Sequence, residues 1–178
     1  KDKAIRNYHH WIFSGAIESL EKTAEDGSVV AVYAHGGERL GSAYINRRSS
    51  ITGRMIAFGD TPWENAIGEA IDGAIHYRLA LFSGAETTAY RLIHGEGDRL
   101  PGLVVDRYGH TLVMQISTLG MEKLRSVVTK ILIARLAPET IYEKSDIPTR
   151  KEEGLAPTER DIFGHTRDRL TVLEQGMR

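Results

Sequence analysis

Apolar and polar positions alternate over four short stretches in the first third of the chain, as they do in half-buried strands. Turn-forming pairs such as Asp26-Gly27, Gly36-Gly37 and Ser49-Ser50 separate these stretches. The pattern is typical of a small, twisted β-barrel, and it predicts strands at residues 12–17, 29–34, 40–45 and 51–57.

The apolar period then changes from two to that of a helix. Thr61-Pro62 opens this stretch, and proline suits a first helical turn. A helix is therefore predicted over residues 62–82, ending near Ser83-Gly84. Its apolar stripe comprises Ala66, Ile67, Ala70, Ile71, Ala74, Ile75, Leu79 and Phe82.

The second half of the chain mixes strand-like and helical patterns, which predicts an α+β arrangement. Pro138 ends its helical pattern. Polar, proline- and glycine-containing residues 145–165 are expected to form one long loop. The expected elements are strands at 89–93, 103–105, 111–117 and 140–143, a helix at 121–136, and a last short strand at 170–173.

Composition limits the possible functions. The 178 residues allow one domain or two small ones, and 41% hydrophobic with 26% charged residues indicates a folded, soluble protein. A net charge of -1 means that any nucleic-acid site must be local. With no long apolar run we expect no membrane partner and a cytoplasmic location. Zero cysteines exclude thiolate chemistry on these residues, and the seven histidines show no metal-binding spacing, so no metal is expected.

Aromatic side chains gather near the N-terminus, where His9-His10 precedes Trp11-Ile12-Phe13. Exposed, these rings would stack on RNA bases. We expect instead that Trp11 and Phe13 anchor the barrel core, because large aromatics usually supply buried area. The histidines are left open.

Four arginines fall in one acid-free segment, and they form the best basic patch in the chain. Arg47-Arg48 occupies a hairpin-like turn, where two guanidinium groups suit phosphate binding, although loop arginines are often merely solvated. The predicted phosphate contacts here are Arg39, Arg47, Arg48 and Arg54.

Residues 94–102 contain glycines in a pattern that suggests a nucleotide-binding loop. Such a loop must open a helix, whereas Pro101-Gly102 leads straight into a strand-like stretch, so no cofactor site is assigned. The carboxylates Glu96, Asp98 and Asp106, with His94, would be the acid–base set of a self-contained enzyme. A turn with an ion-paired rim is the favoured interpretation, and no catalytic residue is predicted.

Residues 142–146 end another strand with three charges. They could line a cleft with Arg91 or Arg107, which makes those two arginines further RNA-binding candidates. The alternative interpretation is that the charges of residues 142–146 form ion pairs that only stabilise the fold, and this interpretation is somewhat favoured.

Taken together, these segments resemble the bacterial large-subunit (23S) ribosomal RNA cytosine-C5 methyltransferases. The block from Glu96-Gly97-Asp98 to Asp106-Arg107-Tyr108-Gly109 is the most specific part. The family usually has proline at His10 and arginine at Lys144. The resemblance rests on residues 9–17, 40–46, 90–98, 100–109, 141–146 and 153–155 and covers essentially the whole chain.

The resemblance implies a PUA-like RNA-binding β-barrel at 1–60, a linking helix at 61–84 and a small EEHEE domain at 85–178. It also implies that the chain is truncated before a Rossmann-like domain that would bind S-adenosylmethionine (SAM). C5 methylation needs a thiolate that adds to the cytosine ring, and no cysteine is present. This chain is therefore expected to position structured ribosomal RNA, without a cofactor or activity of its own.

An interaction module without RNA affinity is the main alternative. The family resemblance makes a homodimer plausible, and either predicted helix offers an apolar face for it.

Overall fold

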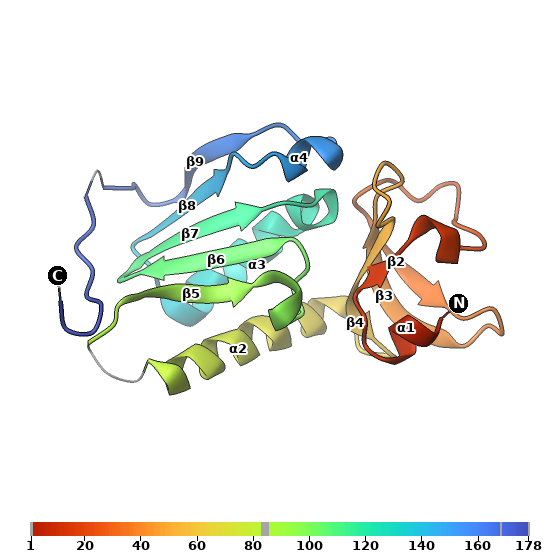
Figure 1. Cartoon of the computed structure of the whole chain (residues 1–178), viewed down its shortest axis with the longest axis horizontal. Coiled ribbons are helices and arrows are strands. Elements are labelled where there is room, and N and C mark those ends of the chain that lie inside the picture. The colour runs from red at the N-terminus through yellow and green to blue at the C-terminus, as the bar shows by residue number, and fades with distance from the viewer. Residues whose placement is uncertain (1, 83–85, 168, 178) are drawn as a thin grey trace.

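The computed structural model describes residues 2–82, 86–167 and 169–177, which form a mixed α/β molecule with two separate sheets (Figure 1). The first sheet lies at one end of an elongated molecule and the second sheet occupies the rest. None of the helices in these ranges is long and apolar enough to cross a membrane.

The first sheet is antiparallel and has the strand order β1-β4-β3-β2. Residues from alternate positions of its strands form a small core with Ile5 of α1 (Lys3–Arg6). The expected strand at 12–17 is much shorter, because a 3-10 turn at Ser14–Ala16 follows β1. The strands are β1 (Trp11–Ile12), β2 (Val29–Tyr33), β3 (Arg39–Ile45) and β4 (Gly53–Phe58).

The second sheet has the order β5-β6-β7-β8-β9 and is antiparallel except between β7 and β8. The helix α3 (Leu119–Leu136) makes the crossover that this parallel pair requires. Thr118 caps the helix, accepting a hydrogen bond from the Met121 amide. The strands are β5 (Ala89–His94), β6 (Leu103–Tyr108), β7 (Thr111–Ile116), β8 (Thr140–Ser145) and β9 (Thr158–Phe163).

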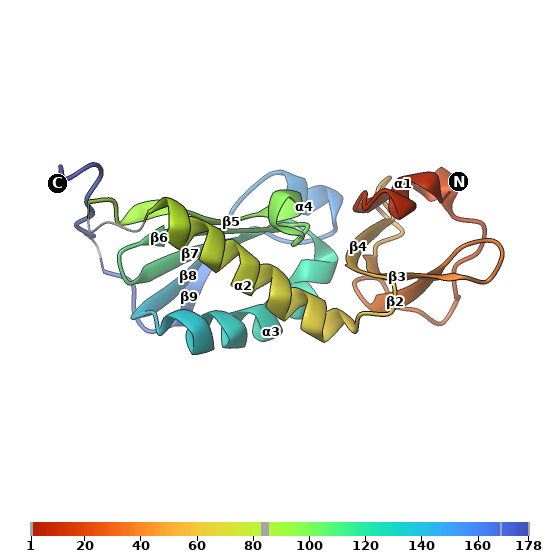
Figure 2. The same ribbon diagram turned by 90° about the horizontal axis from the view of Figure 1, so that it is seen from below.

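Two long helices, α2 (Trp63–Leu81) and α3, cover one face of the second sheet (Figure 2). The middle of the α2 stripe and most of the α3 stripe are buried in the main core of this chain, whereas Leu79, near the end of α2, is 48% exposed. Tyr44 and Ile56 of the first sheet belong to the same core. Hydrophobic packing is therefore continuous from one sheet to the other.

Two expectations for the C-terminal third were wrong. The supposed loop at 145–165 contains the short helix α4 (Thr149–Glu152) and the strand β9. Residues 170–173 form no strand, although the Thr88 amide donates to the Leu173 carbonyl at 2.9 Å. The expected helix end at Ser83-Gly84 lies outside the described residues, and α2 closes at Leu81.

Candidate nucleic-acid interface

Three side chains form a row on the face of the first sheet that meets the second half of the chain. Trp11 pairs with Arg54 across β1 and β4, and Arg54 pairs with Tyr44 across β4 and β3, so all three share one face. Their exposed fractions rise along the row from 1% at Tyr44 and 9% at Arg54 to 38% at Trp11. The contact between the two halves of the chain thus excludes solvent at Tyr44 and leaves Trp11 partly exposed.

Tyr44 closes the junction at its buried end. Its hydroxyl donates to the Pro101 carbonyl at 2.9 Å and lies 3.0 Å from the Thr118 hydroxyl. Burial raises the pKa of Tyr44 far above its usual value, so the phenol is neutral at any physiological pH. Gly102 has a positive φ of 77°, and any β-carbon there would collide with Thr118.

Arg54, the middle residue of the row, is ion-paired rather than free. Its guanidinium lies 2.9 Å from a Glu153 carboxylate oxygen, and both side chains are almost fully buried. The Asn46 amide donates to the same carboxylate at 2.7 Å. Arg54, predicted from its sequence neighbours as a phosphate contact, therefore joins the two halves of the chain in this structure.

The expectation that Trp11 and Phe13 anchor the core of the first sheet was wrong. Ile12 points into that core, so its neighbours along the chain point outward. Phe13 is 50% exposed, and its ring meets that of Trp11 edge to face, with centroids 6.3 Å apart. His9 also makes an edge-to-face contact with Trp11, with ring centroids 5.8 Å apart. An exposed row of three rings thus runs along the edge of the first sheet.

A cavity of about 280 Å³, here called the junction pocket, opens beside Trp11. The Trp11 indole N–H donates to Glu96 at 2.8 Å, and both residues line the pocket. Its walls come from both halves of the chain and are Trp11, Arg54, His94, Gly95, Glu96, Gly97, Gly102, Leu103, Val104, Gln115, Ser117 and Thr118.

Arg47 and Arg48 lie exposed in the turn between β3 and β4, as predicted. Arg47 is not free of acidic neighbours, because it forms a 2.8 Å ion pair with Asp26 from an earlier turn. Within the described ranges Arg48 has no ion-pair partner, and its guanidinium lies beside Gly154. Arg39 donates to the Ser42 hydroxyl at 3.2 Å. The turn therefore presents the free guanidinium of Arg48 and the guanidinium of Arg47, which Asp26 partly neutralises.

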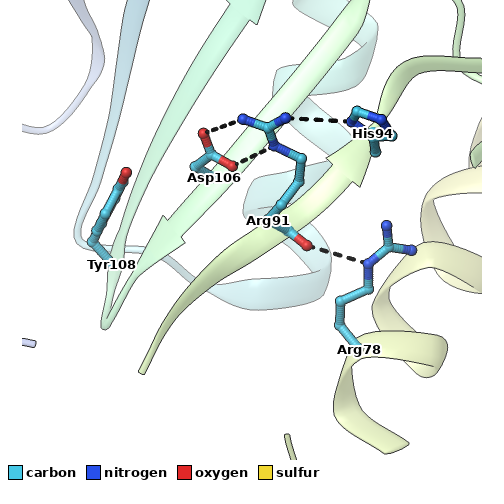
Figure 3. Close-up of a pocket in the computed structure, with 5 residues that line it drawn as sticks. All are labelled: Arg78, Arg91, His94, Asp106 and Tyr108. Atoms are coloured by element: carbon cyan, nitrogen blue, oxygen red, sulfur yellow. Dashed lines mark hydrogen bonds and ion pairs between the residues drawn. The ribbon is translucent and has the colours of Figure 1, made fainter. Parts of the chain in front are cut away.

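Arg91 lies in a second, shallower pocket of about 540 Å³ on the open face of the second sheet (Figure 3). A two-pronged ion pair joins it to Asp106, with a closest distance of 2.9 Å, and the hydrogen bond raises the pKa of Arg91. Arg107 follows Asp106 and therefore points to the opposite face, where it donates to the Gly109 carbonyl at 2.8 Å. The structure does not bring Arg91 and Arg107 together.

The carboxylates considered for an acid–base set have separate partners. Asp98 is clasped by Arg78 at 2.5 and 2.7 Å, Asp106 by Arg91, and Glu96 accepts from Trp11. Each thus belongs to an ion pair or hydrogen bond of its own, as the turn interpretation favoured. Among the described residues no group of three or more acidic or histidine side chains is arranged to hold a metal.

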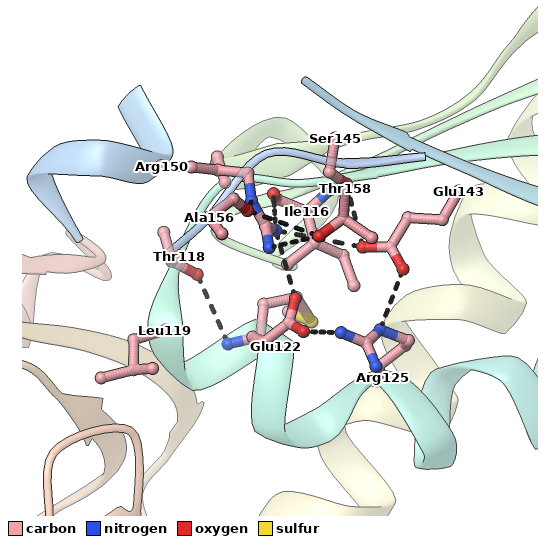
Figure 4. A network of polar contacts seen from close by, with 12 residues as sticks. Ile116, Thr118, Leu119, Glu122, Arg125, Glu143, Ser145, Arg150, Ala156 and Thr158 are labelled. Atoms are coloured by element: carbon pink, nitrogen blue, oxygen red, sulfur yellow. Dashed lines mark hydrogen bonds and ion pairs between the residues drawn. The ribbon is translucent and has the colours of Figure 1, made fainter. Parts of the chain in front are cut away.

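Within residues 142–146, Glu143 and Ser145 belong to a buried ionic network rather than to a cleft with Arg91 or Arg107 (Figure 4). Glu143 is fully buried and lies 3.2 Å from both Arg125 and Arg160, and it accepts from the Ser145 hydroxyl at 3.1 Å. Lys144 points outward to Glu159 and Asp146. The structure thus favours the ion-pairing interpretation.

Arg150 completes this network from α4. It is 2% exposed and donates to the Ile116 carbonyl at 2.8 Å and to Glu122 at 3.1 Å. Burial lowers the pKa of Arg150 and of Arg125, because a charged guanidinium is poorly solvated there. The network joins α3, α4, β8 and β9, and this role could not be read from the sequence.

Comparison with known families assigns the first sheet. Residues 1–58 match the family model of the PUA-like domain. The chain begins with a PUA-like domain.

The curated relatives extend over the whole chain. It is 34% identical over 180 residues to the ribosomal RNA large subunit methyltransferase I of Alteromonas mediterranea, covering 99% of this chain and 45% of that protein. The protein of the same name from Salmonella arizonae is 33% identical over 177 residues, covering 98% and 44%. The chain spans less than half the length of these relatives.

Solved structures share the fold at lower identity. A candidate SAM-dependent methyltransferase from Streptococcus mutans superimposes with a TM-score of 0.78 at 20% identity, covering 98% of this chain and 44% of that one. The structure of SMU.776, described as a candidate methyltransferase in complex with SAH, gives a TM-score of 0.79, also at 20% identity. The arrangement of both sheets therefore occurs in larger proteins.

Proposed function

We propose that this chain is the RNA-binding N-terminal portion of a SAM-dependent large-subunit ribosomal RNA methyltransferase. One observation carries the proposal: the curated relatives that match almost every residue of the chain, from the PUA-like part to the end of the second sheet, bear that name. The chain would position ribosomal RNA for a SAM-binding domain elsewhere in a longer protein. The cytoplasm, where ribosomal RNA is modified in bacteria, is the corresponding location.

The division of labour we propose is a PUA-like β-barrel at 1–60, a linking helix at 61–84 and an EEHEE-type domain at 85–178. The order of β5, β6 and β7, then α3, then β8 and β9 supports the last assignment, with one more strand before the helix than the name EEHEE gives. For cytosine-C5 methylation, the nucleophilic thiolate would have to come from outside these 178 residues, which include no cysteine.

For phosphate contacts we propose Arg47 and Arg48, because they lie exposed in a turn of the PUA-like domain, and Arg39 as a separate candidate at the opposite end of β3. Arg91 is a second candidate on the open face of the second sheet, where its side chain is 49% exposed although paired. Arg54 and Arg107 would support the fold around these contacts, since each is partly buried and already bonded.

Binding measurements with the isolated chain test the proposal. We expect it to bind a structured fragment of large-subunit ribosomal RNA with an affinity that falls steeply with salt, and to show no heat of binding with SAM. Absence of RNA binding at low salt would favour the interaction-module alternative. SAM binding in the micromolar range, or methyl transfer by this chain alone, would overturn the assigned division of labour.

A further inference from the structure

We propose that the junction pocket receives an unpaired base of the RNA, with Trp11 as its stacking platform and Phe13 beside that ring. The inference rests on the proposed function and goes further by assigning single-stranded RNA to this place. Proteins that bind unpaired strands combine exposed aromatic rings with nearby polar groups that reach the base edges. The edge of the first sheet has both.

The exposed aromatic row is the first observation. Trp11 is 38% and Phe13 is 50% exposed, although large aromatic side chains usually contribute to a core. Trp11 and Phe13 flank Ile12, whose side chain points into the core, so their own side chains point outward. The sequence therefore places two large rings side by side on the surface. Stacking on a base is the chemistry that uses such a surface, and every base has a suitable face.

The Trp11 ring is also held in place. Its N–H bonds to Glu96, a residue 85 positions away, at 2.8 Å, and His9 and Phe13 each make an edge-to-face contact with it. Such a ring loses little freedom when a base stacks on it, and preorganisation of this kind strengthens binding. A ring needed only to cover the sheet would not require a hydrogen-bonded partner from the other half of the chain.

The pocket offers groups that can read a base edge. The Gln115 amide makes only a long, 3.5 Å contact to the Lys144 carbonyl, and the Ser117 hydroxyl a 3.4 Å contact to the Gly102 carbonyl. Both side chains therefore retain donors and acceptors for a ligand. Gly95 and Gly97 also line the pocket, and neither has a side chain to fill it.

The size of the pocket fits one nucleoside. Its volume of about 280 Å³ lies just under the roughly 300–1,000 Å³ that encloses drug-sized ligands. A duplex is too wide to enter it, because paired and stacked bases present only their groove edges. The pocket therefore selects a base that is already unpaired or easily turned out.

Tryptophan fluorescence tests the proposal directly. The chain has two tryptophans, so a Trp63→Phe variant leaves Trp11 as the only reporter. We expect a short unpaired RNA to quench this emission to saturation, and a duplex of the same sequence to leave it nearly unchanged. The same titrations in Trp11→Ala, followed by anisotropy of labelled RNA, should show roughly 5- to 100-fold weaker single-strand binding.

Matched variants separate stacking from a merely structural role. Trp11→Phe, which keeps a ring, should lose less affinity than Trp11→Ala. Gln115→Ala, on the other wall, should weaken single-strand binding without touching the Trp11–Glu96 bond. Tyr33→Ala removes a 57% exposed aromatic ring from β2, at the far edge of the same sheet, and should bind as the parent does.

The outcomes distinguish this proposal from the one on which it rests. If RNA binds but Trp11 emission is unchanged and Trp11→Ala keeps full affinity, the base site is wrong and the proposed function stands. Equal quenching by the duplex also overturns the base site. If neither unpaired nor structured RNA binds, the proposed function falls and takes this inference with it.

Discussion

Gly120 in the first turn of α3 lies flat against the ring of Tyr44 from β3. A β-carbon at Gly120 would overlap that ring, and Tyr44 is held by its bonds to Pro101 and Thr118. We therefore expect Gly120→Ala to destabilise the chain by about 1–3 kcal/mol, as overpacking of a rigid site does. Urea denaturation followed by circular dichroism measures this change.

Gly73→Ala is the matched control, because Gly73 lies within α2 with open space where a β-carbon would go. There the same substitution should stabilise the chain by roughly 0.5–1 kcal/mol through the better helix propensity of alanine. Equal changes in the free energy of unfolding, in the same direction for both variants, would show that Tyr44 does not restrict Gly120.

Replacing Glu143 should be among the most damaging single changes to the second sheet. Glu143→Gln removes the carboxylate that faces Arg125, Arg150 and Arg160, leaving buried positive charge uncompensated. Breaking a buried pair in this way costs about 3–5 kcal/mol. In contrast, Glu159→Gln changes only exposed contacts, the ion pair with Lys144 and a hydrogen bond from the Tyr142 hydroxyl, and should cost under about 1 kcal/mol. A similar cost for both in urea denaturation would contradict the importance of burial here.

Charge reversal of the β3–β4 turn should weaken RNA binding. In Arg47→Glu/Arg48→Glu, each lost phosphate contact should lower the slope of log affinity against log salt by somewhat under about one unit. Since both side chains are exposed, folding should change little. Arg167→Glu, a 73% exposed arginine near the other end of the molecule, is the control. Unchanged affinity and slope in the double variant would move the search to Arg91.

Acid should remove the contribution of the ion pair between α2 and α3. Arg135 lies 2.8 Å from Asp72, and its hydrogen bond lowers the pKa of Asp72 below 3.8. A carboxyl group whose pKa is lower in the folded chain than in the unfolded chain stabilises the fold when the pH is above the unfolded-state pKa. This stabilisation is lost as the pH falls through the folded-state pKa. Asp72→Asn should therefore cost under about 1 kcal/mol near pH 7, discounted for exposure, and progressively less as the pH falls below the usual carboxyl pKa. A difference that persists in acid would mean that the amide disturbs packing instead.

Most strands and both long helices could be predicted from periodicity, because one face of each is buried. The edge strand β9 could not. Its only neighbour is β8, and Glu159, Arg160 and Asp161 are exposed there, so no apolar alternation marks it. The helix α4, only four residues long, is held by Arg150 within the ionic network rather than by an apolar stripe.

The exposed turn of Arg47 and Arg48 was predictable, since adjacent arginines in a hairpin connection have nowhere to be buried. The buried ion pair of Arg54 could not be predicted, because Glu153 lies about a hundred residues further along the chain and only folding brings the two together. The same holds for Trp11, whose partner Glu96 comes from the 3-10 turn between β5 and β6. Local sequence shows which residues can bind RNA, whereas long-range pairing decides which are still available.

The core that Tyr44 and Ile56 share with the second sheet has a consequence for how the chain melts. Separate domains joined by a linker unfold independently, each with its own midpoint. Here, loss of the second sheet would uncover Tyr44 and Ile56 and break the ion pair of Arg54 with Glu153, so the PUA-like domain would lose part of its own stability. The two halves therefore form a single cooperative unit, and a strand of RNA held at their junction would protect both from unfolding at once.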